Sequence, residues 1–143
     1  MMTAQLLIER AKKEKNYDLV IQAMPYAQLI GMTCIPIGKS LIFKLPPNED
    51  NIGNPTLPAL HGGVIAGFME MSASLHAVLT QDTSIPKVVD FSIDYLSPGR
   101  LKETFAECQV IRHGSKIINV SIIAWQETKK SPIATARVHL LLQ

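Results

Sequence analysis

One acidic residue, Glu70, lies in the middle of an apolar run that extends from His61 to Gln81. A helix that is hydrophobic nearly all round is expected to be buried. A carboxylate at its centre loses several kcal/mol of hydration unless partners or water receive it. We therefore predict that Glu70 takes part in chemistry, either as a nucleophile or as a general base.

Two glycines, Gly62 and Gly63, open this run directly after His61. N–H groups at a helix N-terminus lack intrahelical acceptors, and the helix dipole there favours negative charge. They suit a carbonyl oxygen that becomes negative under attack, and glycines let a ligand come close to the backbone. Glu70 follows His61 by nine residues, or two and a half helical turns. The two groups of one chain cannot then reach the same substrate carbon, so we expect a second copy to supply one of them.

The surrounding pattern predicts one helix inside an antiparallel sheet. Helices are expected over residues 3–15 and 18–30, with Thr3 and Asp18 as N-caps and Gly31 as a stop. A hairpin over 33–37 and 40–45 turns at Gly38-Lys39, and a loop without regular structure is expected over 46–59. Period-2 alternation predicts four more strands, over 89–95, 105–112, 117–126 and 134–142.

In the first of these strands, apolar side chains should share one half-buried face: Val89, Phe91, Ile93 and Tyr95. The fold class is thus α+β, with about six antiparallel strands wrapped around one long helix. We divide the chain into an N-terminal helical extension, 1–30, and a main domain, 31–143.

Composition excludes several classes of function. A net charge of +2, with no long basic block, argues against nucleic acid as a partner. We recognise no signal sequence and no stretch of roughly 20 apolar residues that would cross a membrane. Cys34 and Cys108 form no ligand cluster, so we expect no metal, free thiols and a cytoplasmic location.

The order of elements, together with two motifs, resembles the hotdog-fold acyl-CoA thioesterases. The motifs are His-Gly-Gly at the helix start with an acid nine positions after the His, and Asp94-Tyr95-Leu96-Ser97-Pro98-Gly99 after the next strand. The nearest branch contains the phenylacetate-pathway thioesterases, the Glu-type 4-hydroxybenzoyl-CoA thioesterases and the small thioesterase-superfamily proteins. The likeness covers about residues 31–142.

This resemblance implies roles for individual residues of a catalytic site at a dimer interface. Glu70 would be the nucleophile or general base, and the Gly62 N–H would hold the thioester oxygen. His61 would anchor the preceding loop or act in acid–base chemistry. The family's amide side chain lies six residues before the His, where this chain has Pro55, so Asn54 at seven residues is the candidate.

The resemblance also implies substrate-binding residues. Gly63 and Ser74 would lie near the thioester, and Asp90 would line the channel for coenzyme A. The turn His113-Gly114-Ser115-Lys116 would touch the pantetheine and phosphates, with Arg100, Lys102 and Arg112 as further cations. Phe68, Met69, Met71 and Leu75 would line the acyl tunnel.

The function expected from these residues is hydrolysis of an aryl- or medium-chain acyl-CoA to a free acid and CoA. No cofactor is implied, because coenzyme A is part of the substrate. A homodimer, or a tetramer of two dimers, is expected. One alternative is a non-catalytic acyl-CoA-binding module on the same fold. A hydratase is another, but its Asp-x4-His pair is missing, because Tyr95 stands five residues after Asp90.

Overall fold

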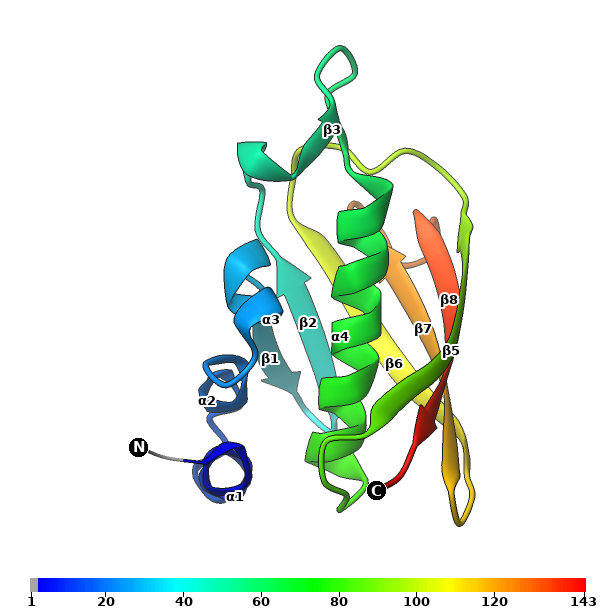
Figure 1. Cartoon of the computed structure of the whole chain (residues 1–143). Helices are drawn as coiled ribbons and strands as arrows, with labels where there is room; N and C mark the ends of the chain where they lie inside the picture. Colours follow the sequence, from blue (N-terminus) through cyan, green and yellow to red (C-terminus); the bar gives the residue numbers. More distant parts are fainter. Residues whose placement is uncertain (1–2) are drawn as a thin grey trace.

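A computed structural model describes residues 3–143 of the chain; Met1 and Met2, the start of the expected 1–30 extension, lie outside that range. Its main sheet has six antiparallel strands in the order β1-β2-β6-β7-β8-β5. The strands are β1 (Thr33–Ile37), β2 (Ser40–Leu45), β5 (Lys87–Tyr95), β6 (Thr104–His113), β7 (Ile117–Trp125) and β8 (Ala134–Leu141). Figure 1 shows the sheet curling around one long helix, α4 (Gly62–Thr80), which confirms the expected α+β hotdog fold.

Helix α4 lies along the concave face of the sheet and contacts β2, β5, β6, β7 and β8. The side chains that face the sheet belong to the core; Phe68 and Met69, for example, have no exposed surface. The opposite face, which carries Gly67, Glu70 and Met71, is only half-buried. Helix α4 is therefore covered on most of its sides, as expected, but within residues 3–143 the face that carries Glu70 is covered only in part.

The length and composition of α4 also correct the expectation that nothing in the chain approaches a membrane span. Its 19 residues contain a window with a mean hydropathy of 1.3, which is long and apolar enough for a span. The helix instead packs on the sheet of its own chain, and the sheet takes up much of its apolar surface.

The N-terminal extension forms three helices that join the common core. They are α1 (Ala4–Glu14), α2 (Asp18–Ile21) and α3 (Pro25–Ile30). The Thr3 side chain accepts a hydrogen bond from the Leu6 N–H, which confirms the predicted cap. Ile8, Ala27 and Ile30 are buried in the same cluster as the sheet residues.

The single helix expected over 18–30 is wrong, because it is divided before Pro25. Proline has no N–H and restricts the residue before it, so it is placed where a new helix begins. Asp18 is not an N-cap either, since its Oδ1 accepts a hydrogen bond of 2.9 Å from the Cys34 N–H of β1. Gly31 ends α3 in the left-handed conformation, as predicted.

Two expectations about strands also need correction. The loop over 46–59 contains a 3-10 turn, η1 (Glu49–Asn51), and a small hairpin of β3 (Ile52–Asn54) with β4 (Ala59–Leu60). The four prolines of that segment lie outside these elements, so they do not prevent the pairing.

In β5 the expected half-buried face is interrupted, because the pairing with β8 shifts by one residue between Val88 and Asp90. Val89 is consequently 50% exposed. Phe91 and Ile93 pack on the core as predicted, and the core neighbour before the irregularity is Val88. Tyr95 is 51% exposed at the end of the strand.

Candidate active site

The Glu70 side chain lines a cleft of about 300 Å³ on the half-buried face of α4. Gly67, Met71 and Ser74 share the cleft because residues three, four and seven apart lie on one face of a helix. Tyr26, from α3 of the extension, is its remaining wall. Within residues 3–143 no cation pairs with the Glu70 carboxylate. The carboxylate is thus placed in a partly apolar cleft that a small molecule can enter.

The start of α4 lines a second cleft, of about 450 Å³. His61 is the N-cap residue, and its carbonyl accepts the N–H groups of Val64 and Ile65. The N–H groups of Gly62 and Gly63 have no acceptor among the hydrogen bonds of residues 3–143. These two donors, at the positive end of the helix dipole, fit an oxygen that gains negative charge.

Tyr95 fixes this helix start from the neighbouring strand. Its hydroxyl donates a hydrogen bond of 2.6 Å to the Gly62 carbonyl. A Cβ at position 62 would lie 3.3 Å from the same hydroxyl, so a larger residue there would crowd the contact. From the sequence Tyr95 was predicted only to share an apolar strand face and to belong to the Asp94–Gly99 motif; its contact with Gly62 was not predicted.

Asn54 and His61 lie at the same end of α4. Asn54 lines the cleft of Gly62, and its Oδ1 accepts a hydrogen bond of 3.0 Å from the Thr56 N–H. Its amide nitrogen is therefore the donor that remains for a ligand. The His61 N–H donates to the Asn51 carbonyl at 2.8 Å, and a Cβ on Gly53 would meet the His61 ring at 3.1 Å. Both contacts tie His61 to the preceding loop.

Glu70 and Gly62 therefore lie in different clefts of one chain. Eight residues of helix separate them by about 12 Å along the axis. No cleft of the described residues contains both groups. This geometry agrees with the prediction, made from the spacing, that one chain cannot present both to the same carbon.

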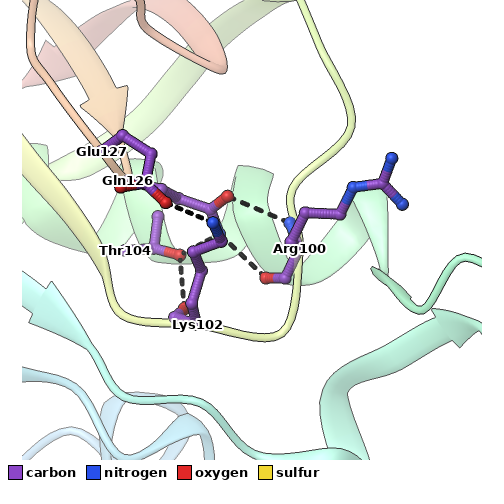
Figure 2. Close-up of polar contacts among 5 residues, drawn as sticks. All are labelled: Arg100, Lys102, Thr104, Gln126 and Glu127. Carbon is purple, nitrogen blue, oxygen red and sulfur yellow. Dashed lines mark hydrogen bonds and ion pairs between the residues drawn. The ribbon is translucent and has the colours of Figure 1, made fainter.

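The segment between β5 and β6 forms one wall of the helix-start cleft, and Gln126 clamps it (Figure 2). The Gln126 Oε1 accepts the Arg100 N–H at 3.0 Å, and its Nε2 donates to the Arg100 carbonyl at 2.8 Å and to Thr104 Oγ1 at 3.0 Å. The Arg100 guanidinium donates to the Leu57 carbonyl, and Lys102 pairs with Glu127. Both cations have local partners and are weaker candidates for CoA phosphates.

A third cleft, of about 380 Å³, is lined by the turn after β6. Gly114, Ser115 and Lys116 line it together with Arg112. His139, which the sequence analysis did not single out, is also part of the wall. The cleft thus gathers two full positive charges and turn residues, which suits an anion.

Two of the predicted substrate-binding residues lie beside this cleft rather than in it. His113 is not part of the wall, because its Nδ1 lies 2.9 Å from Gln81 Oε1 at the end of α4. Asp90 Oδ2 lies 3.3 Å from His139 Nδ1, so it reaches the cleft through that histidine.

The predicted acyl-tunnel residues are largely misplaced. Met71 lines the Glu70 cleft, whereas the side chains of Phe68, Met69 and Leu75 are sealed in the core. Their spacing on α4 puts them on the face that the sheet covers. Tyr26, which no local sequence pattern connects with the helix, also lines the Glu70 cleft.

Neither cysteine lines any of the three clefts described above. Cys34 and Cys108 are free and buried. Burial raises the pKa of the Cys34 thiol to about 12, and it also raises the pKa of Cys108. Neither thiol is therefore available as a thiolate nucleophile. In residues 3–143 no group of three His, Cys, Asp or Glu side chains is arranged to hold a metal ion.

A family model described as the thioesterase superfamily matches residues 57–133, more than half of the chain. The chain belongs to the thioesterase superfamily. This confirms the resemblance drawn from the His-Gly-Gly and Asp94–Gly99 motifs, and it makes the chain a thioester hydrolase by family.

Individual relatives agree with this membership. The thioesterase is 29% identical over 133 residues to the medium/long-chain acyl-CoA thioesterase YigI of Escherichia coli, covering 81% of this chain and 84% of YigI. It is 38% identical to a protein of Chromobacterium violaceum with a known crystal structure, with a TM-score of 0.77 and coverage of 95% and 96%. A Streptococcus mutans protein crystallised with acetyl CoA is 16% identical, with a TM-score of 0.69 and coverage of 79% and 89%; that likeness concerns the fold alone.

Proposed function

We propose that this thioesterase hydrolyses acyl-CoA with Glu70 as the catalytic carboxylate and the Gly62 N–H as the oxyanion donor. The observation that carries the proposal is the position of Glu70, unpaired within residues 3–143 and facing a partly apolar cleft on the central helix. The curated relative YigI, which is named a medium/long-chain acyl-CoA thioesterase, supports acyl-CoA as the substrate class. Asn54 and His61 would complete the polar end of the site.

The reaction consumes one water. The thioester carbon is attacked by water that Glu70 deprotonates, or by Glu70 itself, and the carbonyl oxygen becomes negative next to the Gly62 N–H. Collapse of the tetrahedral species breaks the carbon–sulfur bond, and the CoA thiolate takes up a proton. In the nucleophilic route a second attack, by water on the anhydride, releases the acid and restores Glu70. Neither route uses a cofactor.

The site is completed across a homodimer in this proposal. Strand β5 is an edge of the sheet and exposes Val89 and Tyr95, and Leu96 directly after the strand is exposed as well; all three are at least half exposed. The other edge, β1, contains Pro36, which has no N–H to donate to a further strand. Two β5 edges can pair around a twofold axis, which brings the helix start of one chain towards the Glu70 cleft of the other.

Arg112 and Lys116 are the proposed contacts for the CoA phosphates. They line the cleft of about 380 Å³ after β6, while Arg100 and Lys102 have partners of their own. Replacing Lys116 with alanine should raise the KM for acyl-CoA roughly tenfold and leave kcat near the wild-type value, since a charge-assisted hydrogen bond is worth about 1.5–3 kcal/mol. An unchanged KM in Lys116→Ala and Arg112→Ala would remove both from the phosphate site.

We also propose a cytoplasmic location. The two buried free thiols, Cys34 and Cys108, are typical of a reducing compartment. Labelling of the intact protein in fractionated cells tests this, and recovery with an extracytoplasmic fraction would overturn it.

The central test measures release of the CoA thiol from a panel of aryl- and straight-chain acyl-CoAs. Glu70→Gln should lose at least about a hundredfold in kcat, the size typical of a removed acid–base group. The matched control is Glu103→Gln, which removes a surface carboxylate paired with Lys44 at 2.8 Å. Equal rates for Glu70→Gln and wild type would exclude Glu70 from the mechanism.

The nucleophilic and general-base routes differ in the fate of solvent oxygen. After turnover in water enriched in oxygen-18, label in the Glu70 carboxylate marks the anhydride route. Label confined to the free acid is expected when Glu70 acts on water, and also when water attacks the acyl carbon of an anhydride, so only label found in Glu70 decides between the two routes. Mass spectrometry of the peptide that contains residue 70 makes this measurement.

The alternative, an acyl-CoA-binding module, has its own signature. It predicts tight binding of acyl-CoA to the wild type with no thiol release from any substrate of the panel. The N–H groups of Gly62 and Gly63, which have no acceptor within residues 3–143, favour the enzyme. They can stabilise a negative charge that develops only during the reaction.

A further inference from the structure

Tyr26 lies on the N-terminal extension, outside the part of the chain that the family model matches, yet it forms a wall of the Glu70 cleft. It is the second residue of α3, a helix held in place by Ala27 and Ile30, which are buried. The Tyr26 ring itself is 36% exposed. A side chain on a firmly anchored helix therefore remains open to the cleft.

The ring is seated against α4 at Gly67. A Cβ built at position 67 would lie 2.5 Å from the Tyr26 hydroxyl oxygen and 2.7 Å from a ring carbon. Contacts that short do not occur, so any residue larger than glycine would push the ring away from the helix. The Tyr26 ring thus packs directly on Gly67, which lies one turn before Glu70 on the same face of α4.

The contact also brings the phenol close to the carboxylate. Burial raises the pKa of Tyr26, and the negative charge of Glu70 raises it further. The phenol is therefore neutral at physiological pH. Its ring presents an apolar surface beside Met71, where a bound acyl group would begin.

We propose that Tyr26 is a specificity-determining residue: its ring, seated in the notch at Gly67, closes one side of the Glu70 cleft and limits the size of the acyl group. This inference rests on the proposed acyl-CoA thioesterase function. It assigns a role in the site to the N-terminal extension, whereas the sequence analysis treated residues 1–30 only as an addition to the main domain.

The first test compares chain-length profiles. Replacing Tyr26 with alanine should raise the ratio of kcat/KM for dodecanoyl-CoA over hexanoyl-CoA roughly tenfold or more, because a wider apolar cleft accepts additional methylenes. Tyr26→Phe keeps the ring and should keep the wild-type ratio. Leu29→Ala, a change at a residue that is 74% exposed on the same helix, is the matched control. A wild-type ratio in Tyr26→Ala would overturn the proposal.

The second test is a double-mutant cycle on thermal stability. Gly67→Ala should give a more negative change in Tm in the wild type than in Tyr26→Ala, because in the wild type the new methyl group must displace the tyrosine ring. In the Tyr26→Ala background the same change should be neutral or stabilising, since alanine is the better helix former. Equal effects of Gly67→Ala in both backgrounds would show that the ring is not seated in the notch.

The two proposals fail in different ways. If the wild type releases no CoA from any acyl-CoA, the hydrolase assignment fails. The affinities of non-hydrolysable thioether analogues with six- and twelve-carbon chains then test Tyr26 alone, by isothermal titration calorimetry. A gain for the longer analogue in Tyr26→Ala supports the wall, and an unchanged preference rejects it.

Discussion

At the scale of single residues, the helix start depends on a contact from outside the helix. Tyr95 is the last residue of β5, and its hydroxyl donates a hydrogen bond to the Gly62 carbonyl. The N–H of the same glycine is the proposed oxyanion donor. The two groups belong to adjoining peptide units, so the hydroxyl holds the residue whose N–H must be aimed. Tyr95 is accordingly a positioning residue in the proposed mechanism.

Removing this hydroxyl should affect turnover more than binding. In Tyr95→Phe we expect kcat to fall about threefold to tenfold with KM within twofold of wild type, because a neutral hydrogen bond is worth about 1 kcal/mol. The ring stays in place, so Tm should change little. Steady-state kinetics on the best acyl-CoA measure the effect.

The control for this substitution is Tyr17→Phe, which removes a phenol hydroxyl from a residue of the N-terminal extension that lines neither the helix-start cleft nor the Glu70 cleft. A kcat for Tyr95→Phe equal to that of Tyr17→Phe would contradict the positioning role.

At the scale of elements, α4 combines a structural face with a chemical one. The sheet covers the side of Phe68 and Met69, and Glu70 with Met71 faces the cleft. His76 lies six residues beyond Glu70 and is half-buried, and its buried Nδ1 has no hydrogen-bond partner within residues 3–143. Burial is the main cause that lowers the pKa of His76, and the nearby Glu107 opposes that shift.

A lowered histidine pKa makes stability depend on pH in one direction. As pH falls below about 6.5, the unfolded chain binds a proton at His76 that the folded chain does not, so the free energy of unfolding decreases. We expect Tm to fall between pH 7.5 and pH 5.5, and to fall less in His76→Gln. Differential scanning calorimetry at both pH values measures the difference.

Other groups also titrate in this range, so the comparison needs a second histidine. His113→Gln removes an exposed imidazole that contacts Gln81. If both variants lose the same number of degrees on acidification, His76 is not the source of the effect.

At the scale of the whole molecule, both edges of the sheet expose an aliphatic side chain. Val89 is 50% exposed on β5, and Ile37 is 59% exposed on β1 at the opposite edge. A buried lysine at a strand pairing between two chains would have to lose its hydration. We expect Val89→Lys to convert the proposed dimer to monomer at micromolar concentration and to reduce kcat/KM at least about tenfold.

Ile37→Lys adds the same charge at the other edge and should leave both mass and activity unchanged. Light scattering coupled to gel filtration gives the mass. A monomeric wild type that is fully active would contradict the proposal that the site spans two chains.

Local patterns in the sequence were enough to predict most of the architecture. Alternation of apolar residues identified β5, β6, β7 and β8, because burial on one face imposes a period that neighbouring residues display. The turn at Gly38-Lys39 identified the hairpin of β1 and β2, and the apolar run around Glu70 identified α4. The His-Gly-Gly start and Asp94–Gly99 indicated the family, which the family model confirms. The break at Pro25 also has a local cause, because proline fits the first turn of a helix and not its interior.

The tertiary structure decided which residues meet. Tyr26 reaches Gly67 across 41 positions of sequence, and Tyr95 reaches Gly62 across 33. Contacts of this kind depend on how α3 and β5 pack against α4. No local periodicity in the sequence indicates which residue either tyrosine will contact. The sequence by itself identified Glu70 as the chemical group and, through the helical spacing, its separation from Gly62. Only the packed chain showed that the Glu70 cleft has a wall from the N-terminal extension, because that wall depends on how α3 packs against α4.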